Sequence, residues 1–284
     1  QNGLPTSLKY ASMTDGVNLV TFTDDQFPFP PGVLAVVAKT LQMDQGQQTA
    51  TIVDADIVFN PAFVKKTMWG LATDTYPGLP DTVTFDIESI ATHEIGHILG
   101  LVHSGAPTSS MFFVLQARKN GRTLKPDDIA WASYRYPAGN FNTAYGSIEG
   151  KVLYGYNQSK PVAGALLIAR NYSTGAYYHS YSDVNGNYHI PGLPADNYHV
   201  LLRALNGKVF GYPMTPANVS AYLYAITSIT DYPGEWYSQG ESSTDNPHDS
   251  TLVSVLVGQT ANSINLITNI DAVSPSVDGV SPAN

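Results

Sequence analysis

The sequence of 284 residues contains no cysteine, which excludes disulfide bonds and thiolate ligands for a metal ion. Charged residues make up only 13% of the chain, and 14 basic residues are outnumbered by 23 acidic ones. The net charge of −9 argues against a nucleic-acid partner, because binding phosphates requires clustered lysine and arginine. No apolar run approaches the roughly 18 residues that a membrane-spanning helix needs, so we predict no membrane span.

The low charge, combined with 18 tyrosines, is typical of secreted β-rich proteins, so we expect an extracellular or cell-surface location. The sequence begins at Gln1 with neither an initiator methionine nor a secretory signal, and we expect a mature or trimmed form. The length and the hydrophobic content of 43% allow one or two domains. We expect a monomer.

Histidine is also absent before residue 93, where an eleven-residue run contains three of the seven histidines. His93 and His97 are four residues apart, so on a helix they lie on one face and can bind one metal ion. Glu94 lies beside them, where its carboxylate can accept a proton from a water molecule at the metal. Gly100 can adopt a positive φ, which lets the helix end and brings His103 back to the same ion. Three protein ligands leave the fourth tetrahedral position open, as in catalytic zinc sites.

An amphipathic helix with ordinary histidines is the alternative interpretation of this run. A bare His-Glu-x-x-His match would leave that alternative open. Here five specified positions are filled, which favours a site for one catalytic Zn²⁺ ion.

The extended pattern resembles the metzincin metallopeptidases, in which a methionine turn lies beneath the metal. Ser104 directly follows the third histidine and Met111 comes eight residues after it, and both features resemble the matrixin branch. Asp127 and Asp128, in Leu-Lys-Pro-Asp-Asp, resemble the start of the matrixin closing helix. The segment 51–60 resembles the family's Ala-Asp-Ile strand.

This resemblance, which runs from Val17 to Pro137, implies an α+β metzincin-like fold with a mixed twisted sheet, an active-site helix and a C-terminal helix. It implies a zinc-dependent endopeptidase that acts on a protein or peptide substrate, with Glu94 as the general base. It also implies that Asp127 and Asp128 brace the site instead of doing chemistry.

Each supporting residue also has a simpler interpretation. Met111 could fill a gap in the core, although its spacing favours the methionine turn. Asp127 and Asp128 follow a proline and stabilise a helix N-terminus whatever the protein does. Asp54 and Asp56 have two alternatives, as calcium ligands or as an exposed strand face, and the second is favoured.

Three segments of the predicted catalytic domain, residues 1–140, show the alternation of strands. These segments are 17–22, 33–41 and 50–59. In the last, the apolar side chains lie on one face, with Asp54 and Asp56 on the other. Matrixins have a long helix between their first two strands, and no such helical period precedes Ile87. We therefore expect the domain to lack its N-terminal strand and helix.

Two helices are predicted in the same domain. Asp86 is the expected N-cap of the first, over 87–99. The second begins at residue 126 and ends near residue 134, and the irregular segment 104–124 between them carries the methionine turn and a wall of the specificity pocket. Three side chains of the first helix are expected to face the core: Ala91, Ile95 and Ile98.

Two departures from the matrixin pattern limit what the resemblance implies. Residues 1–92 contain no histidine, so the second, structural zinc of the animal matrixins cannot be built in the same way. After Met111 the chain continues with two phenylalanines and a valine, without the proline and tyrosine that line the primed-side pocket. Substrate preference therefore cannot be carried over.

From residue 146 the pattern changes to short strands separated by turns. Segments up to residue 270 resemble the carboxypeptidase regulatory-like domains, which are transthyretin-like β-sandwiches. The segments that carry this resemblance are 148–152, 161–165, 182–188, 192–194, 232–234, 258–260 and 264–266. Asn185-Gly186 is a strong hairpin signal that agrees with it. We predict an all-β transthyretin/Ig-like sandwich over 146–270, followed by a linker or flexible tail over 271–284.

The function of the sandwich is harder to predict. Its aromatic residues could form a platform for carbohydrate or peptide, but ordinary packing of strand aromatics is favoured. The aromatic residues concerned are Tyr177, Tyr178, Tyr181, Trp236 and Tyr237. The histidines of this part have no ligand spacing and are expected to face solvent: His179, His189, His199 and His248.

Two alternatives to an enzyme remain. One is a catalytically silent zinc-containing module that uses the sandwich for surface or carbohydrate attachment. The other is a surface adhesin in which the peptidase-like part is incidental. The presence of Glu94 favours the enzyme over the silent module.

Overall fold

The computed structural model describes eight stretches of the chain: 8–30, 32–43, 50–64, 69–70, 85–114, 121–209, 212–219 and 230–270. Two compact units divide the chain, Gln1–Leu101 with Leu115–Thr123 and Val102–Val114 with Leu124–Asn284. This division falls inside the predicted catalytic domain. The predicted tail, 271–284, and part of the irregular segment before the second helix lie outside the described residues.

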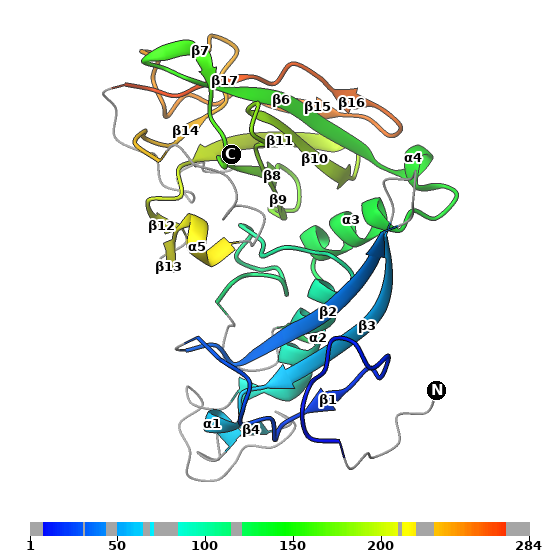
Figure 1. Cartoon of the computed structure of the whole chain (residues 1–284). Helices are drawn as coiled ribbons and strands as arrows, with labels where there is room; N and C mark the ends of the chain where they lie inside the picture. The colour runs from blue at the N-terminus through cyan, green and yellow to red at the C-terminus, as the bar shows by residue number, and fades with distance from the viewer. Residues whose placement is uncertain are drawn as a thin grey trace. The chain divides into compact units, whose positions relative to one another are not determined.

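A three-stranded mixed sheet forms the framework of the first unit. Its strands are β1 (Val20–Thr21), β2 (Ala35–Met43) and β3 (Ala50–Phe59), in the order β1-β3-β2. β1 pairs with β3 in parallel, whereas β2 pairs with β3 antiparallel. Figure 1 shows β2 and β3 as two long neighbouring strands. The three strands lie within or overlap the segments that the sequence predicts, and the mixed sheet is confirmed.

Alternation along β3 places apolar side chains in the core of this unit. Ile57 and Phe59 are 5% and 0% exposed and form a cluster with Ile90 of the following helix. This burial removes apolar surface from water, which is the main force that fixes the strand in the sheet.

The opposite face of β3 is buried as well, so the predicted exposed strand face is wrong. Asp54 and Asp56 are 2% and 1% exposed. Asp56 accepts the N–H groups of Ser12 and Leu19, each at 2.8 Å, and Asp54 accepts the N–H of Gly16 at 3.0 Å. The chain that precedes β1 covers this face, because the two carboxylates bind its backbone amides.

The helix α2 (Ile87–Ile98) begins where the sequence predicts. Asp86 is its N-cap and accepts the N–H of Ser89 at 2.9 Å. Ala91 and Ile98 pack against the core, as predicted. Ile95 is 48% exposed, so its predicted core position is wrong. It follows Ile90 by five residues, a rotation of about 140° around the helix.

The remaining elements of the first unit are short. They are α1 (Pro61–Val64), β4 (Trp69–Gly70) and β5 (Phe85–Asp86), and β4 pairs with β5 in parallel. Among the described residues before α2, α1 is the only helix.

Two five-stranded sheets form most of the second unit. The first has the order β10-β6-β16, with β7 and β17 also paired to β6, and the second has the order β14-β11-β8-β9, with β15 paired to β11. The strands of the first are β6 (Gly146–Tyr154), β7 (Asn157–Pro161), β10 (Asn187–Leu193), β16 (Thr260–Ala261) and β17 (Leu266–Ile267). Those of the second are β8 (Leu166–Asn171), β9 (Tyr177–Tyr181), β11 (Asp196–Arg203), β14 (Glu235–Trp236) and β15 (Val253–Val255).

Buried side chains of both sheets meet in one cluster, the main core, which includes Ile148 of β6 and Val200 of β11. A second core on β8 and β11 contains Leu166 and Trp236. Smaller elements complete the unit: α3 (Pro126–Arg135), α4 (Phe141–Ala144), β12 (Gly207–Val209), β13 (Tyr212–Met214) and α5 (Pro216–Val219). The helix predicted from residue 126 to about 134 is therefore confirmed as α3.

The five aromatic residues considered as a platform, Tyr177, Tyr178, Tyr181, Trp236 and Tyr237, are buried or half-buried. Tyr178 and Trp236 are 4% and 3% exposed, which agrees with the favoured interpretation. His179 and His199 are 3% and 8% exposed, so the expectation that they face solvent is wrong. No helix in the described part of the chain is long and apolar enough to span a bilayer.

Candidate metal centre

The helix α2 carries the first two histidines of the eleven-residue run. One helical turn separates His93 from His97, so both side chains leave the same face of the helix. Their Nε2 atoms lie 3.1 Å apart, and the rings meet edge to face. Two imidazole nitrogens at this separation point toward a common position for a cation.

The end of α2 redirects the chain toward the third histidine. Gly100 has a φ of +86°, which a residue with a Cβ rarely adopts, and the expected turn at this glycine is confirmed. The N–H of Gly100 donates to the carbonyl of His97 at 3.0 Å, and the N–H of Leu101 donates to that of Gly96 at 2.9 Å. These bonds occupy the last helical carbonyls and end the helix.

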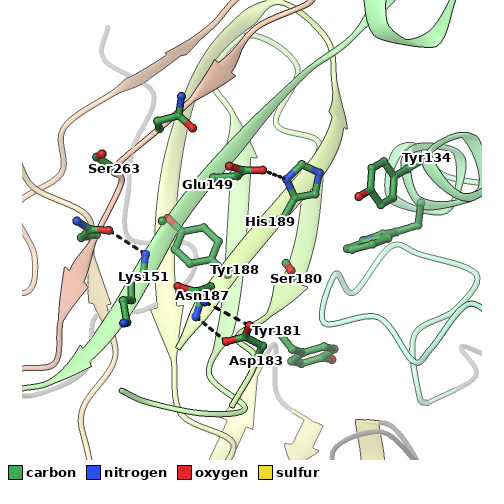
Figure 2. A pocket seen from close by; sticks show the side chains of 14 residues that line it. Tyr134, Glu149, Lys151, Ser180, Tyr181, Asp183, Asn187, Tyr188, His189 and Ser263 are labelled. Carbon is green, nitrogen blue, oxygen red and sulfur yellow. Dashed lines mark hydrogen bonds and ion pairs between the residues drawn. The ribbon is translucent and has the colours of Figure 1, made fainter. Parts of the chain in front are cut away.

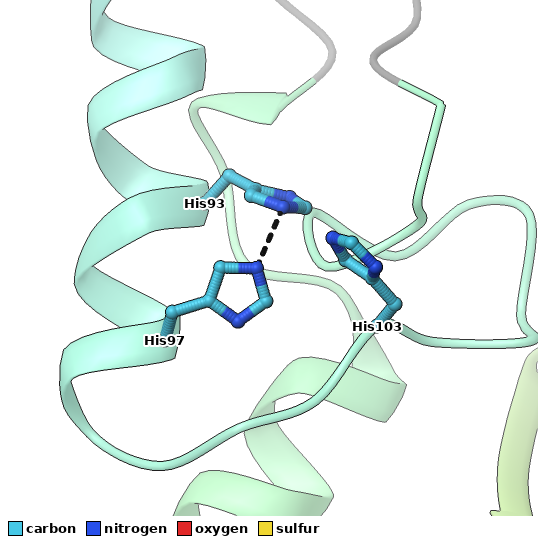
Figure 3. A group of neighbouring side chains, drawn as sticks. All are labelled: His93, His97 and His103. Atoms are coloured by element: carbon cyan, nitrogen blue, oxygen red, sulfur yellow. Dashed lines mark hydrogen bonds between the residues drawn. The ribbon is translucent and has the colours of Figure 1, made fainter. Parts of the chain in front are cut away.

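His93, His97 and His103 come together as the spacing predicts. One nitrogen from each lies within 4.8 Å of the others, and Figure 3 shows the three rings gathered beside the helix. His97 donates Nδ1–H to the carbonyl of Leu101 at 2.9 Å, and His103 donates Nδ1–H to that of Asn218 at 2.7 Å. Because carbonyl oxygens only accept, these bonds leave Nε2 of both rings as the ligand atom.

The chemistry of this donor set fits a zinc ion. Zinc binds neutral imidazoles in tetrahedral geometry, and burial lowers the pKa of His97, which favours its neutral form. Glu94 is 5% exposed, and its Oε2 is buried without a hydrogen-bond partner among the described residues. Burial raises the pKa of Glu94 to about 7. A carboxyl group with this pKa can both accept and release a proton near neutral pH.

Met111 lies in a tight loop after the third histidine and is 3% exposed. Its carbonyl accepts the N–H of Ser104 at 2.7 Å. Asp128 accepts the N–H groups of Ser110 and Met111 at 2.8 and 3.2 Å, and that of Lys125 at 2.8 Å. One carboxylate of α3 thus binds both the loop around Met111 and the start of its own helix.

Asp127 binds a different part of the same loop. It accepts the hydroxyl of Ser104 at 2.7 Å, and it accepts both the N–H and the Nδ1–H of His179, each at 2.8 Å. Asp127, Ser104 and His179 are all at most 3% exposed. Sequence reasoning missed His179 and Asn218, because they lie 52 residues after Asp127 and 115 residues after His103. No spacing signal connects residues this far apart.

A separate hollow of about 640 Å³ opens on the second unit. Figure 2 shows Tyr134, Glu149, Asp183 and His189 among the side chains that line it. His189 donates its Nδ1–H to Glu149 at 2.7 Å. Asp54 and Asp56 belong neither to this hollow nor to the histidine cluster.

Comparison with known proteins identifies the part of the chain that carries the histidines. Residues 20–136 match the matrixin family. The matched segment contains every predicted site residue, from His93 to Asp128. This matrixin match supports a metallopeptidase domain over these residues, as the sequence predicts.

Plant metalloendoproteinases are similar to part of this chain. Metalloendoproteinase 2-MMP of Arabidopsis thaliana is 40% identical over 75 residues, which cover 26% of this chain and 20% of that protein. Metalloendoproteinase 4-MMP of the same plant is 32% identical over 112 residues, or 39% of this chain and 28% of that protein. Metalloendoproteinase 1 of Glycine max is 46% identical over 50 residues, or 18% and 16%. The chain thus spans only 20% and 28% of the length of the first two relatives.

One comparison with a solved structure covers about half of this chain. Fervidolysin from Fervidobacterium pennivorans aligns with 48% of this chain and 18% of its own, at 10% identity and a TM-score of 0.25. That score is too low to indicate a shared fold.

Proposed function

We propose that this chain is a secreted zinc-dependent endopeptidase that hydrolyses peptide bonds in a protein or peptide substrate. In this proposal His93, His97 and His103 bind one zinc ion, and Glu94 is the general base. The observation that carries it is the convergence of three imidazole nitrogens within 4.8 Å, together with the burial of Glu94, which follows His93 directly in the chain. The matrixin match and the metalloendoproteinase relatives support the same activity.

In the proposed reaction, the three histidines bind the metal ion and Glu94 transfers the proton. When bound, zinc would polarise the scissile carbonyl and lower the pKa of water toward about 7. The three histidines would hold the ion. Glu94 takes the proton of the attacking water and passes it to the leaving amine. Its burial excludes bulk water from this carboxylate, so the proton is delivered to the amine and not lost to solvent.

Location, oligomeric state and calcium belong to the proposal too. Low charge and high tyrosine content support an extracellular or cell-surface protein, and we propose a monomer. Fractionation of a producing culture and light scattering of the purified chain test these two points. Calcium at Asp54 and Asp56 is disfavoured, because these carboxylates already bind backbone amides.

Cleavage of a mixed peptide library by the full chain, with products identified by mass spectrometry, tests the activity. The zinc-loaded protein should cut internal bonds, a chelator should abolish cleavage, and added zinc should restore it. Glu94→Gln should retain zinc and lower turnover by about 10² to 10⁴, the usual worth of a general base. Glu88→Gln is the matched control, since Glu88 is on the same helix with a side chain 55% exposed.

Two results would count against the proposal. Wild-type turnover by Glu94→Gln would remove the role assigned to this carboxylate. Full zinc occupancy without chelator-sensitive cleavage would favour the catalytically silent binding module.

A further inference from the structure

We infer that the five-stranded sheet of the second unit that contains β9 positions His103, and that Tyr181 on this sheet is a positioning residue for the metal centre. The inference rests on the proposed function, because His103 is one of the proposed zinc ligands. It concerns the loop 102–114, which belongs to the same compact unit as the two five-stranded sheets.

The first contact holds the imidazole of His103. Its Nδ1–H donates to the carbonyl of Asn218 at 2.7 Å, which turns the opposite nitrogen toward the other histidines. Asn218 is itself fixed in a turn, because its Oδ1 accepts the N–H and the hydroxyl of Thr215 at 3.1 and 2.5 Å. The next residue, Val219, is fully buried in the second core. The Asn218 carbonyl that orients His103 is therefore held in place by the neighbouring Val219, which is buried in the second core.

The second contact holds the backbone of His103. The Tyr181 hydroxyl on β9 donates to the His103 carbonyl at 3.1 Å. The Tyr181 ring packs against the second core, which fixes the hydroxyl in place. His103 is thus held at its ring by Asn218, 115 residues further along the sequence, and at its carbonyl by Tyr181, 78 residues further along.

The two residues after His103 are tied to the same sheet. Ser104 shares Asp127 with His179 of β9, in a network in which all three residues are buried. Gly105 lies against Leu166 of β8 so closely that a Cβ at this position would stand 2.3 Å from a Leu166 methyl carbon. Three successive residues therefore contact β8, β9 or the turn at α5.

Pre-orientation has a measurable consequence for metal binding. A histidine side chain that is already fixed in its binding orientation loses little conformational entropy when the zinc ion binds, whereas a mobile side chain loses more. Removing a contact that holds His103 should therefore weaken zinc binding without removing a ligand. The coupling is reciprocal, so zinc should in turn stabilise the strands that hold His103.

Tyr181→Phe tests the inference in the full chain, because it removes one hydroxyl and keeps the packed ring. The zinc dissociation constant, measured by competition with a chelating dye, should rise by about tenfold, as for other groups that orient a metal ligand. The visible spectrum of the cobalt-substituted protein should change, because the geometry of the ligand set changes. Tyr198→Phe is the matched control: its hydroxyl donates to the carbonyl of Pro194 at 2.8 Å in the same unit. The control should bind zinc and cobalt as the wild type does.

Hydrogen exchange gives a second readout that needs no catalysis. Zinc should slow backbone exchange in peptides that cover β9 and α5 in the wild type, and it should have no such effect in His103→Ala. His179→Asn, which keeps a donor where Nδ1 stood, should retain more zinc affinity than His179→Leu. Melting curves of each variant identify one that fails to fold, and in that case the exchange data decide.

The results separate this inference from the proposed function. Unchanged zinc affinity and cobalt spectrum in Tyr181→Phe, with no zinc-dependent protection of β9, would overturn the inference. Wild-type protein that binds zinc but cleaves no peptide would overturn the proposed function alone. Wild-type protein that binds no zinc would overturn both.

Discussion

At the scale of single residues, Asp86 shows how much one buried carboxylate can hold together. It is 1% exposed, and it accepts the N–H of Ser89 at 2.9 Å and the Ser89 hydroxyl at 2.6 Å. Arg122 donates to both of its oxygens, at 2.6 and 2.8 Å. The Asp86–Arg122 pair joins the start of α2 to a residue 36 positions further along the chain.

Asp86→Ala should lower the free energy of unfolding by about 2 kcal/mol, because it removes a helix cap and the buried acceptor of the Ser89 hydroxyl. Urea denaturation followed by circular dichroism measures the change. Glu88→Ala is the control, since Glu88 pairs with the same arginine at 2.9 Å but has a side chain 55% exposed. Its cost should be about 1 kcal/mol or less. Equal losses in the two variants would refute the role of burial.

The predictability of the site residues follows from their separation in the sequence. His93, His97 and Gly100 could be predicted because helix geometry relates residues three and four apart. His179, Tyr181 and Asn218 could not, because their contacts with the loop depend on strand pairing far along the chain. The burial of polar side chains was also not predicted. Asp54 and Asp56 were expected to be exposed, because the backbone amides that they bind cannot be identified from the sequence.

At the scale of elements, α3 is packed against β10 through a glycine. Gly192 has a φ of +69°, and a Cβ there would lie 2.8 Å from the Cα of Ala130 in α3. The helix approaches the strand this closely because no side chain stands between them. Trp131 of the same helix donates its indole N–H to the carbonyl of His179 at 2.9 Å.

Gly192→Ala should lower the free energy of unfolding by about 2 to 4 kcal/mol, since it adds a left-handed backbone strain to a clash with backbone atoms. Thermal melting of the two proteins measures this loss. Gly175→Ala provides the control, because Gly175 also has a positive φ, +70°, but has nothing within 4 Å of a Cβ. A control as unstable as Gly192→Ala would show that strain alone, and not the contact with α3, sets the cost.

The elements themselves were largely predictable, and the exceptions have local causes. The bounds of α2 follow from a capping aspartate and a terminal glycine, both of which act within a few residues. The start of α3 follows from a proline and two aspartates. The prediction that Ile95 of α2 faces the core was wrong, because Ile95 is 48% exposed. The apolar character of a residue does not by itself specify which side of a helix packs against the rest of the protein.

At the scale of the whole molecule, stability should depend on pH through two carboxyl groups of the second unit. Burial raises the pKa of Glu235 to about 10 and that of Glu241 to about 7, from a usual value near 4.5. Glu241 and Asp245 face Glu235 and repel its charge, and the amide of Asn269 donates to it at 2.6 Å. Both groups therefore bind a proton more tightly in the folded chain than in the unfolded one.

This difference fixes the sign of the pH dependence. The protonated carboxyl groups contribute their full stabilisation below the pKa that they have in the unfolded chain. This contribution is lost as the pH rises through about 7 for Glu241 and about 10 for Glu235. The free energy of unfolding should fall between pH 5 and pH 9, measured by urea denaturation. Glu235→Gln should flatten the decline above pH 7, whereas Glu88→Gln, at a side chain 55% exposed, should leave it unchanged. An unaltered slope in Glu235→Gln would contradict the assignment.

Metal removal should lower the melting temperature of the whole chain. A ligand that binds only the folded state stabilises it by about 2.7 kcal/mol at a hundredfold excess over its dissociation constant. A chelator should therefore destabilise the wild type but leave His97→Ala unaffected. His248→Ala, at an exposed histidine, should respond like the wild type. Identical responses in all three proteins would show that the chelator acts elsewhere.

The pairing of β6 sets the order in which the second unit can fold. β6 is the first strand of this unit, yet β16 and β17 pair with it in parallel near the end of the described chain. The hydroxyls of Ser147 and Thr260, which bond at 2.8 Å, are 113 residues apart. Such distant pairing makes folding slow, because a long loop must close before the contact forms. On the ribosome, β6 must wait for almost all the described chain to be synthesised, so its sheet is completed among the last events of folding.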